Sequence, residues 1–98
     1  LLAELQDRYV ITSNRESGFG RYDIMLEPKE KGRDVFLIEF KVARADRGET
    51  LEDAVRSALN QIEKMQYEIA LRSRGIAPEQ IRKYGFAFEG KKVLIGEG

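Results

Sequence analysis

Hydrophobic and polar positions alternate along several short stretches of this chain, and a period of two residues is the pattern of β-strands. YVITSNRE, residues 9–16, is a β-prone run. In RYDIMLEP, residues 21–28, one face carries Tyr22, Ile24 and Leu26, and the other carries Arg21, Asp23 and Met25. VFLIEFKV, residues 35–42, alternates in the same way. The glycines of SGFG and the polar KEKGRD segment supply turns between these runs, so we predict an antiparallel meander of three strands.

The period changes after Thr50, where apolar residues recur every three or four positions as in an amphipathic helix. TLED fits a capping box, with Thr50 at the N-cap and Asp53 at the third helical position. Gly75 suits the left-handed residue that follows a helix. We therefore predict one long helix that ends just before Gly75. Its apolar face comprises Leu51, Ala54, Val55, Ala58, Ile62, Met65 and Ile69.

Two more strands and a helical stub complete the predicted order of elements. IRKYGFAF, residues 81–88, alternates like a strand, and VLI, residues 93–95, forms a short final strand after an EGKK turn. LLAELQDR, residues 1–8, reads as the last turns of a helix, and nothing caps its start. We predict one mixed α/β domain over residues 1–98, in the order (α)βββαββ with a truncated first helix. We also expect the chain to be a fragment of a longer protein.

The composition narrows the chemistry that such a domain can perform. The 98 residues include no Cys and no His. This excludes disulfides, thiol nucleophiles, Ser-His-Asp triads and zinc sites of the Cys or HExxH type. Carboxylates, Lys, Tyr, Gln and an oxygen-binding cation would have to carry any catalysis. Because 17 Lys and Arg balance 17 Asp and Glu, affinity for nucleic acid would have to come from local patches.

An acid and a lysine interrupt the third predicted strand. Glu39 and Lys41 lie two positions apart and therefore share a face. The preceding hairpin can bring Asp23 beside them. Two neighbouring carboxylates repel each other unless a cation neutralises them, and Mg²⁺ takes one or two carboxylates together with water and substrate phosphate. Lys41 would then orient the attacking water. A plain ion pair on a strand face is the alternative that this spacing leaves open.

Three segments together resemble the PD-(D/E)XK nuclease superfamily: SNRESGFGRYDIML, FLIEFKV and ALNQIEKMQY. More narrowly, the chain resembles the nuclease-like domain at the C-terminus of bacterial predicted AAA-ATPase-like proteins. The resemblance implies a restriction-endonuclease-like core, αβββαβ, with a metal ion at the splayed strand ends. It also implies that Asp23, Glu39 and Lys41 are the motif residues, and that the backbone carbonyl of Phe40 is a further metal ligand.

The resemblance implies further residues around that site. In the RecB-like branch of the superfamily a helical Gln and a following Tyr assist the site. Gln61 matches that Gln, whereas Tyr67 lies six residues later and departs from the branch's spacing of four. Gln61 also borders the apolar helix face, where it can be a plain boundary residue. Glu16 is placed to reach the metal or to pair with Arg21, and Arg15 to touch phosphate or to form a structural ion pair.

Two functions of different classes follow. The first is a Mg²⁺- or Mn²⁺-dependent nuclease acting on DNA or RNA, with Asp23 and Glu39 holding the metal, and Lys41 and Gln61 assisting. The second is a catalytically silent nuclease-fold module that binds nucleic acid or protein. The resemblance implies an upstream AAA-ATPase-like domain, and an exposed sheet edge leaves a homodimer open. Since neither a membrane span nor a signal peptide is evident, we expect a cytoplasmic protein.

Overall fold

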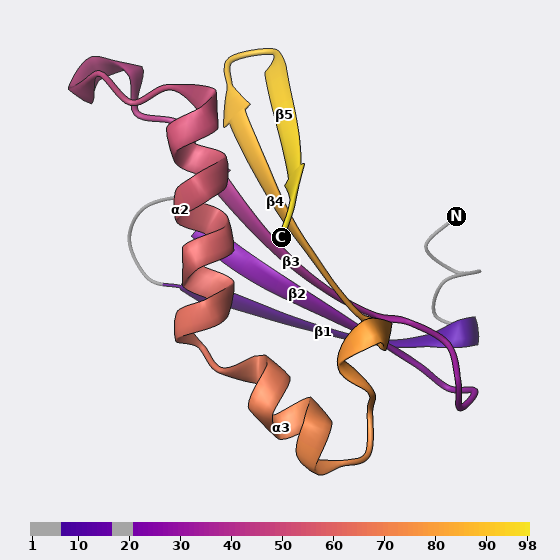
Figure 1. The fold of residues 1–98 in the computed structure, drawn as a ribbon. Coiled ribbons are helices and arrows are strands. Elements are labelled where there is room, and N and C mark those ends of the chain that lie inside the picture. The colour runs from indigo at the N-terminus through magenta and orange to yellow at the C-terminus, as the bar shows by residue number, and fades with distance from the viewer. Residues whose placement is uncertain (1–6, 17–20) are drawn as a thin grey trace.

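The computed structural model of the chain describes residues 7–16 and 21–98, and the side chains of residues 14–16 and 21–22 lie outside that description. Within these residues a five-stranded sheet carries two α-helices on one face (Figure 1). The elements are β1 (Tyr9–Glu16), β2 (Arg21–Pro28), β3 (Val35–Val42), the 3-10 turn η1 (Ala45–Arg47), α2 (Leu51–Lys64), α3 (Tyr67–Ser73), the 3-10 turn η2 (Pro78–Gln80), β4 (Ile81–Glu89) and β5 (Lys92–Glu97).

The sheet has the order β1-β2-β3-β4-β5 and is mixed. β1, β2 and β3 form the predicted antiparallel meander, with the predicted bounds. β3 and β4 are parallel, because α2 and α3 cross the sheet between them, and β5 returns antiparallel to β4. β5 is longer than the predicted VLI strand. The turn before it consists of two residues, Lys91 and Gly90, of which Gly90 is left-handed (φ 59°). Glu89 and Lys92 therefore already pair as strand residues. The predicted α/β order is confirmed over the described residues.

The prediction of a single long helix was wrong. α2 ends at Lys64, Gln66 adopts a left-handed conformation (φ 57°), and α3 begins at Tyr67 in a new direction (Figure 1). Met65 and Ile69, which a continuous helix would bury, are 42% and 63% exposed. The turn instead brings Leu71 into the core, where it is 1% exposed. No local sequence signal predicts this break, because neither Gly nor Pro occurs near it.

Both ends of the helical region follow the sequence signals. At the start of α2 the Thr50 hydroxyl accepts a hydrogen bond from the Asp53 amide at 3.0 Å, and the Asp53 carboxylate accepts one from the Thr50 amide at 3.1 Å. The predicted capping box is thus confirmed. Gly75 follows α3 with φ 89°, as predicted for a left-handed cap.

In the described part of the chain, no helix combines the length and the apolar character needed to cross a membrane.

Small residues hold α2 close against the end of the sheet. A Cβ atom added at Gly85 of β4 would lie 3.0 Å from the Val55 carbonyl oxygen and 3.1 Å from the Ala58 Cβ. Ala54 and Ala58 are fully buried on the facing side of α2. Because backbone and Cβ atoms are already in contact here, the helix cannot shift without losing this packing. The backbone of α2 around Val55 and Ala58 is therefore held close to β4.

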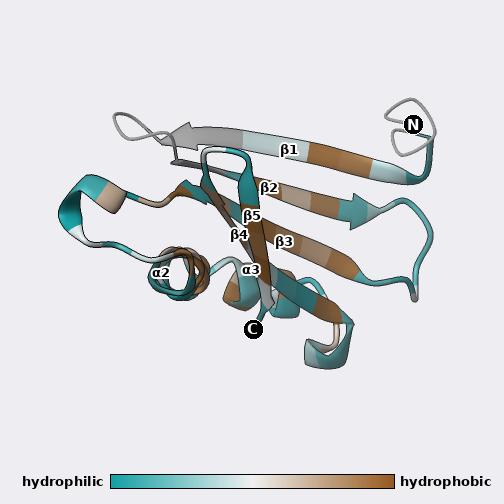
Figure 2. Cartoon of the chain, turned by 90° about the horizontal axis from the view of Figure 1, so that it is seen from above, coloured by the Kyte–Doolittle hydropathy of each residue, from teal (hydrophilic) through white to brown (hydrophobic). Residues whose placement is uncertain are grey.

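The two faces of the sheet differ in what covers them. Both helices lie on one face, and within the described residues no helix lies on the other (Figure 2). The open face carries aromatic side chains at its centre: the rings of Phe36 and Tyr84 stack at 6.3 Å, and those of Phe40 and Phe86 lie 5.1 Å apart. Four residues of β3 face the helices: Val35, Leu37, Glu39 and Lys41. The side chains of Glu39 and Lys41 therefore lie between the sheet and the helices.

Candidate metal centre

Two buried carboxylates face each other across β2 and β3. The antiparallel register sets Asp23 directly opposite Glu39, and the two residues are 5% and 0% exposed. Directly opposed residues of such a pair have Cβ atoms about 4.5–5.5 Å apart. Among the described residues these are the two buried charged side chains. The hairpin register that the sequence left open therefore does bring Asp23 beside Glu39.

This arrangement suits a hard divalent cation. Two carboxylates in a position shielded from water repel each other, and a cation between them removes that repulsion. Among the side chains that the structure describes, which do not include Glu16, no group of three or more Asp, Glu, His or Cys is placed to hold a metal. Asp23 and Glu39 are the two described carboxylates that could hold a cation here, and water, backbone oxygen or substrate would complete the shell. That donor set fits Mg²⁺ or Mn²⁺, which prefer oxygen and keep several waters.

Lys41 is anchored beside the carboxylate pair by two partners that the sequence analysis missed. Its ammonium nitrogen donates to the Glu49 carboxylate and to the Ser57 hydroxyl, both at 2.9 Å. The Lys41 side chain is 18% exposed and that of Glu49 is 20% exposed. Glu49 lies in the loop before α2 and Ser57 lies on α2 itself. One weak sequence signal could have indicated that Glu49 lies near Lys41. Glu49 directly precedes the N-cap residue of α2, at the point where the chain returns over the end of β3.

The Glu49 carboxylate is itself held in its charged form. It accepts a hydrogen bond from the Arg44 amide at 2.8 Å in addition to the one from Lys41. The backbone hydrogen bond from Arg44 and the hydrogen bond from Lys41 lower the pKa of Glu49 below its usual value. Lys41 therefore lies beside a permanent negative charge at neutral pH. The two hydrogen bonds connect the lysine side chain to the loop after β3 and to α2.

Tyr67 contacts the carboxylate pair directly. Its hydroxyl donates a hydrogen bond to the Oδ2 atom of Asp23. The spacing of six residues from Gln61 made this contact unexpected, because in one continuous helix the two side chains would diverge. The break at Gln66 removes that constraint, since Tyr67 starts a new helix in a new direction. The missed signal was therefore the break rather than the tyrosine.

The structure describes fewer contacts for the other predicted site residues. Gln61 is half-buried on α2, one turn after Ser57 and on the same side of the helix. The ring of Phe40 packs on the opposite face of the sheet against Phe86, so only its backbone lies beside Glu39. Its carbonyl as a metal ligand stays a prediction. Glu16 ends β1, but its side chain lies outside the described residues, as does that of Arg15.

The sequence model of one family, the PD-(D/E)XK nuclease superfamily, matches residues 1–98. Neither the curated proteins nor the solved structures contain a match. The family match agrees with the resemblance found in the three sequence segments, and the mixed sheet with helices crossing between β3 and β4 is consistent with a restriction-endonuclease-like fold.

Proposed function

Because the chain belongs to the PD-(D/E)XK nuclease superfamily, we propose that it is a divalent-metal-dependent nuclease that hydrolyses phosphodiester bonds in DNA or RNA. The observation that carries this proposal is the register of β2 and β3, which sets the buried carboxylates of Asp23 and Glu39 opposite each other. Buried acids in register are unfavourable in a purely structural role, and they are the ligands that a phosphate-processing cation needs.

Asp23 and Glu39 are the proposed ligands of Mg²⁺ or Mn²⁺, with the backbone carbonyl of Phe40 as a third protein ligand. When bound, the cation supplies positive charge against the phosphate and makes a water molecule more acidic. The Tyr67 hydroxyl holds the Asp23 carboxylate in place. Because that carboxylate is already fixed by its hydrogen bond, less conformational freedom is lost when it binds a cation.

Lys41 is proposed to orient the attacking water and to stabilise the negative charge that develops on the phosphate. In hydrolysis the water oxygen forms a bond to phosphorus and gives up a proton to solvent. The ester oxygen leaves with the electron pair of the bond that breaks and takes up a proton from solvent. An ammonium group beside that centre stabilises the added negative charge and orients the water through its N–H donors. Glu49 and Ser57 limit the positions that this ammonium group can take. Gln61, on the same side of α2 as Ser57, is proposed to assist by hydrogen bonding.

The alternative is a catalytically silent module that keeps the nuclease fold for binding. The observation that favours it is the engagement of Lys41 by Glu49 and Ser57, because an ammonium group already neutralised by a carboxylate has less charge to offer a phosphate. In this reading the chain binds nucleic acid or protein without cleaving it. The neighbouring AAA-ATPase-like domain and the homodimer stay predictions from the sequence under either function.

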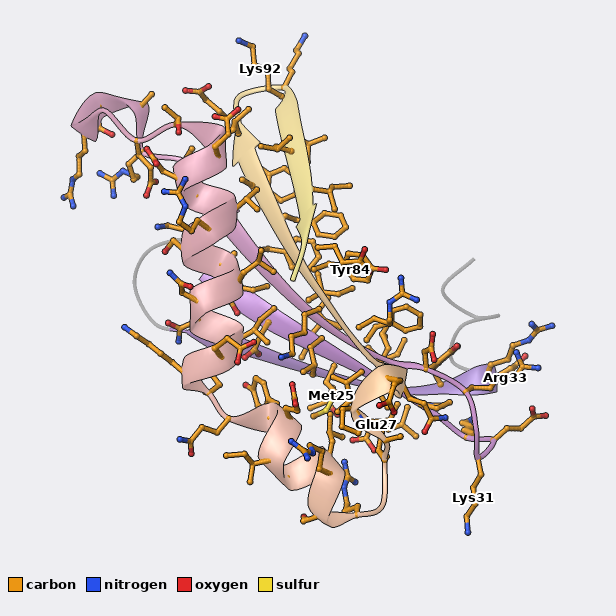
Figure 3. All side chains as sticks on the ribbon, in the orientation of Figure 1. Met25, Glu27, Lys31, Arg33, Tyr84 and Lys92 are labelled. Carbon is orange, nitrogen blue, oxygen red and sulfur yellow. The ribbon has the colours of Figure 1, made fainter. Side chains whose placement is uncertain are left out.

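Cleavage of labelled plasmid, single-stranded DNA and RNA in Mg²⁺ and in Mn²⁺ tests the proposal. We expect metal-dependent cleavage that falls by about 100-fold or more in Lys41→Met and in Glu39→Gln. Lys92→Met is the matched control, because Lys92 is exposed at the tip of the β4–β5 hairpin (Figure 3). Cleavage that is equal in all four proteins would contradict the proposal. Binding of a substrate without cleavage by the wild-type protein would support the silent module.

A further inference from the structure

Lys83 connects the sheet to both helices at the point where the helical region breaks. It lies on the helix-facing side of β4, with its side chain 16% exposed. Its ammonium nitrogen lies 2.6 Å from a carboxylate oxygen of Glu63, in the last turn of α2. The same nitrogen lies 2.5 Å from a carboxylate oxygen of Glu68, in the first turn of α3. One lysine thus contacts the end of one helix and the start of the next.

The break between these helices is a conformation that needs support. Gln66 is left-handed, with φ 57°, and among the described residues no other non-glycine residue has a positive φ. Side chains with a Cβ atom disfavour this conformation, so the surrounding contacts have to stabilise it. α3 spans only Tyr67–Ser73, too short to be stable by itself. The direction of α3 therefore depends on what ties it to the sheet.

In this direction the first residue of α3 reaches Asp23 of the carboxylate pair. Tyr67 follows Gln66 directly and donates its hydroxyl hydrogen bond to Asp23 on β2. Glu68, the next residue, points to Lys83 on β4. Neighbouring residues at the start of α3 are therefore fixed to two different strands, one on each side of β3.

We propose that Lys83 is a positioning residue for the candidate metal centre: by pairing with Glu63 and Glu68 it holds the α2–α3 break in the form that seats Tyr67 on Asp23. Its effect on a cation rests on the proposed function. Its effect on Tyr67 does not, and the two are tested separately.

The charge that this role requires is maintained at neutral pH. Burial lowers the pKa of Lys83, but the hydrogen bonds from its ammonium group to Glu63 and Glu68 outweigh that effect, and the net pKa is raised. Arg72 lies 3.8 Å from the Glu68 carboxylate, so Glu68 faces two cations. Lys83 is therefore cationic at neutral pH.

A double-mutant cycle between Lys83 and Tyr67 tests the positioning role without any metal. The proteins are wild type, Tyr67→Phe, Lys83→Met and the double variant, and urea unfolding is measured for each. We expect Tyr67→Phe to lower the folding equilibrium constant by about tenfold in the wild-type background and by less than about threefold when Lys83 is Met. An equal effect of Tyr67→Phe in both backgrounds would overturn the proposal.

Three further variants control this cycle. Arg82→Met removes the neighbouring cation, which pairs with Glu97 and Asp34 instead, and we expect it to leave the effect of Tyr67→Phe unchanged. Lys83→Arg keeps the charge and is expected to restore most of the coupling. If Lys83→Met does not fold, Glu68→Gln replaces it in the cycle, because it removes the charge of one of the two paired carboxylates and leaves the lysine in place.

Binding of Mn²⁺ then tests the consequence for the metal centre. We expect Lys83→Met and Tyr67→Phe to weaken Mn²⁺ binding by a similar factor, on the order of tenfold. The double variant should bind no more weakly than either single variant. Additive losses would contradict an effect of Lys83 through Tyr67. If no protein including the wild type binds Mn²⁺, the proposed metal centre fails, while the unfolding cycle still decides the positioning role.

Discussion

The hydroxyl of Tyr67 donates a hydrogen bond to the carboxylate of Asp23, although 44 positions separate the two residues in the chain. Asp23 is 5% exposed, so its charge is shielded from water and depends on protein donors or on a cation. The contact links the first residue of α3 to the second strand of the sheet. It makes the break in the helical region part of the candidate metal centre rather than an irregularity of the fold.

Replacing Tyr67 by Phe removes that donor and keeps the ring. We expect the free energy of unfolding to fall by about 1–3 kcal/mol, because a buried carboxylate loses a hydrogen bond. Urea unfolding at pH 7 measures this change. Tyr9→Phe is the matched control, since the Tyr9 ring packs edge-on against Phe36 on the open face of the sheet and should change little. Equal stability of Tyr67→Phe and wild type would show that the contact is not formed in solution.

Glu39→Gln is expected to affect stability in opposite directions with and without metal. Without metal it removes the repulsion between two buried carboxylates, so the free energy of unfolding should rise by about 1–3 kcal/mol. With Mg²⁺ at about 100 times its dissociation constant the wild type should gain about 2.7 kcal/mol, and the variant almost none. Thermal unfolding with EDTA and with Mg²⁺ measures both effects. A loss of stability in EDTA would mean that Glu39 has a structural role.

Glu49→Gln is expected to cause a loss of stability that depends on pH. The folded-state pKa of Glu49 lies below its usual 4.5. A lowered folded-state pKa stabilises the folded protein fully above the unfolded-state pKa, and this contribution disappears as the pH falls through the folded-state value. The variant should therefore be less stable than wild type by about 1–3 kcal/mol at pH 7.

The difference between Glu49→Gln and wild type should shrink progressively as the pH is lowered below the usual value of 4.5. Urea unfolding at several pH values measures it. Glu79→Gln, at an exposed position, should show no such dependence. A difference that stays constant down to acidic pH would exclude the carboxylate of Glu49 as its source.

Gly85→Ala tests whether close packing of α2 positions the site. The new methyl group would meet the Val55 carbonyl oxygen at 3.0 Å and the Ala58 Cβ at 3.1 Å, and neither atom can move without the helix. We expect a loss of about 1–3 kcal/mol in the free energy of unfolding. Gly98→Ala is the matched control, because its methyl group would meet the flexible end of Leu59 at 3.1 Å. Equal effects of the two variants would argue against a fixed helix position.

Much of the fold could be predicted because local signals agree with it. The alternation of β2 and β3, the capping box at Thr50 and the left-handed Gly75 all follow from rules that act over a few residues. The break at Gln66 could not be predicted in this way, since Gln is neither a breaker nor a typical left-handed residue. It follows from tertiary contacts, the burial of Leu71 and the pairing of Glu68 with Lys83.

The candidate site was predictable where it depends on strand periodicity. Glu39 and Lys41 share a face because they are two residues apart, and the register of the hairpin then places Asp23 opposite Glu39. Glu49 and Ser57 were missed, and Tyr67 was named only with a spacing that departs from the family's, because each contact depends on how a loop or helix returns over the sheet. The contacts of Ser57 and Tyr67 join residues 16 and 44 positions apart, which no local pattern encodes, and for Glu49 the place before the N-cap is only a weak signal.

Calorimetric titration of the purified chain with Mn²⁺ tests the central claim most directly. The proteins are wild type, Asp23→Asn, Glu39→Gln and, as a matched control, Glu97→Gln, whose side chain is 50% exposed on β5. If Asp23 and Glu39 form a metal centre, wild type and Glu97→Gln bind Mn²⁺ alike and the other two variants bind it about tenfold more weakly or not at all. If Glu39→Gln binds as tightly as wild type, or if wild type does not bind, the buried carboxylate pair is not a metal centre.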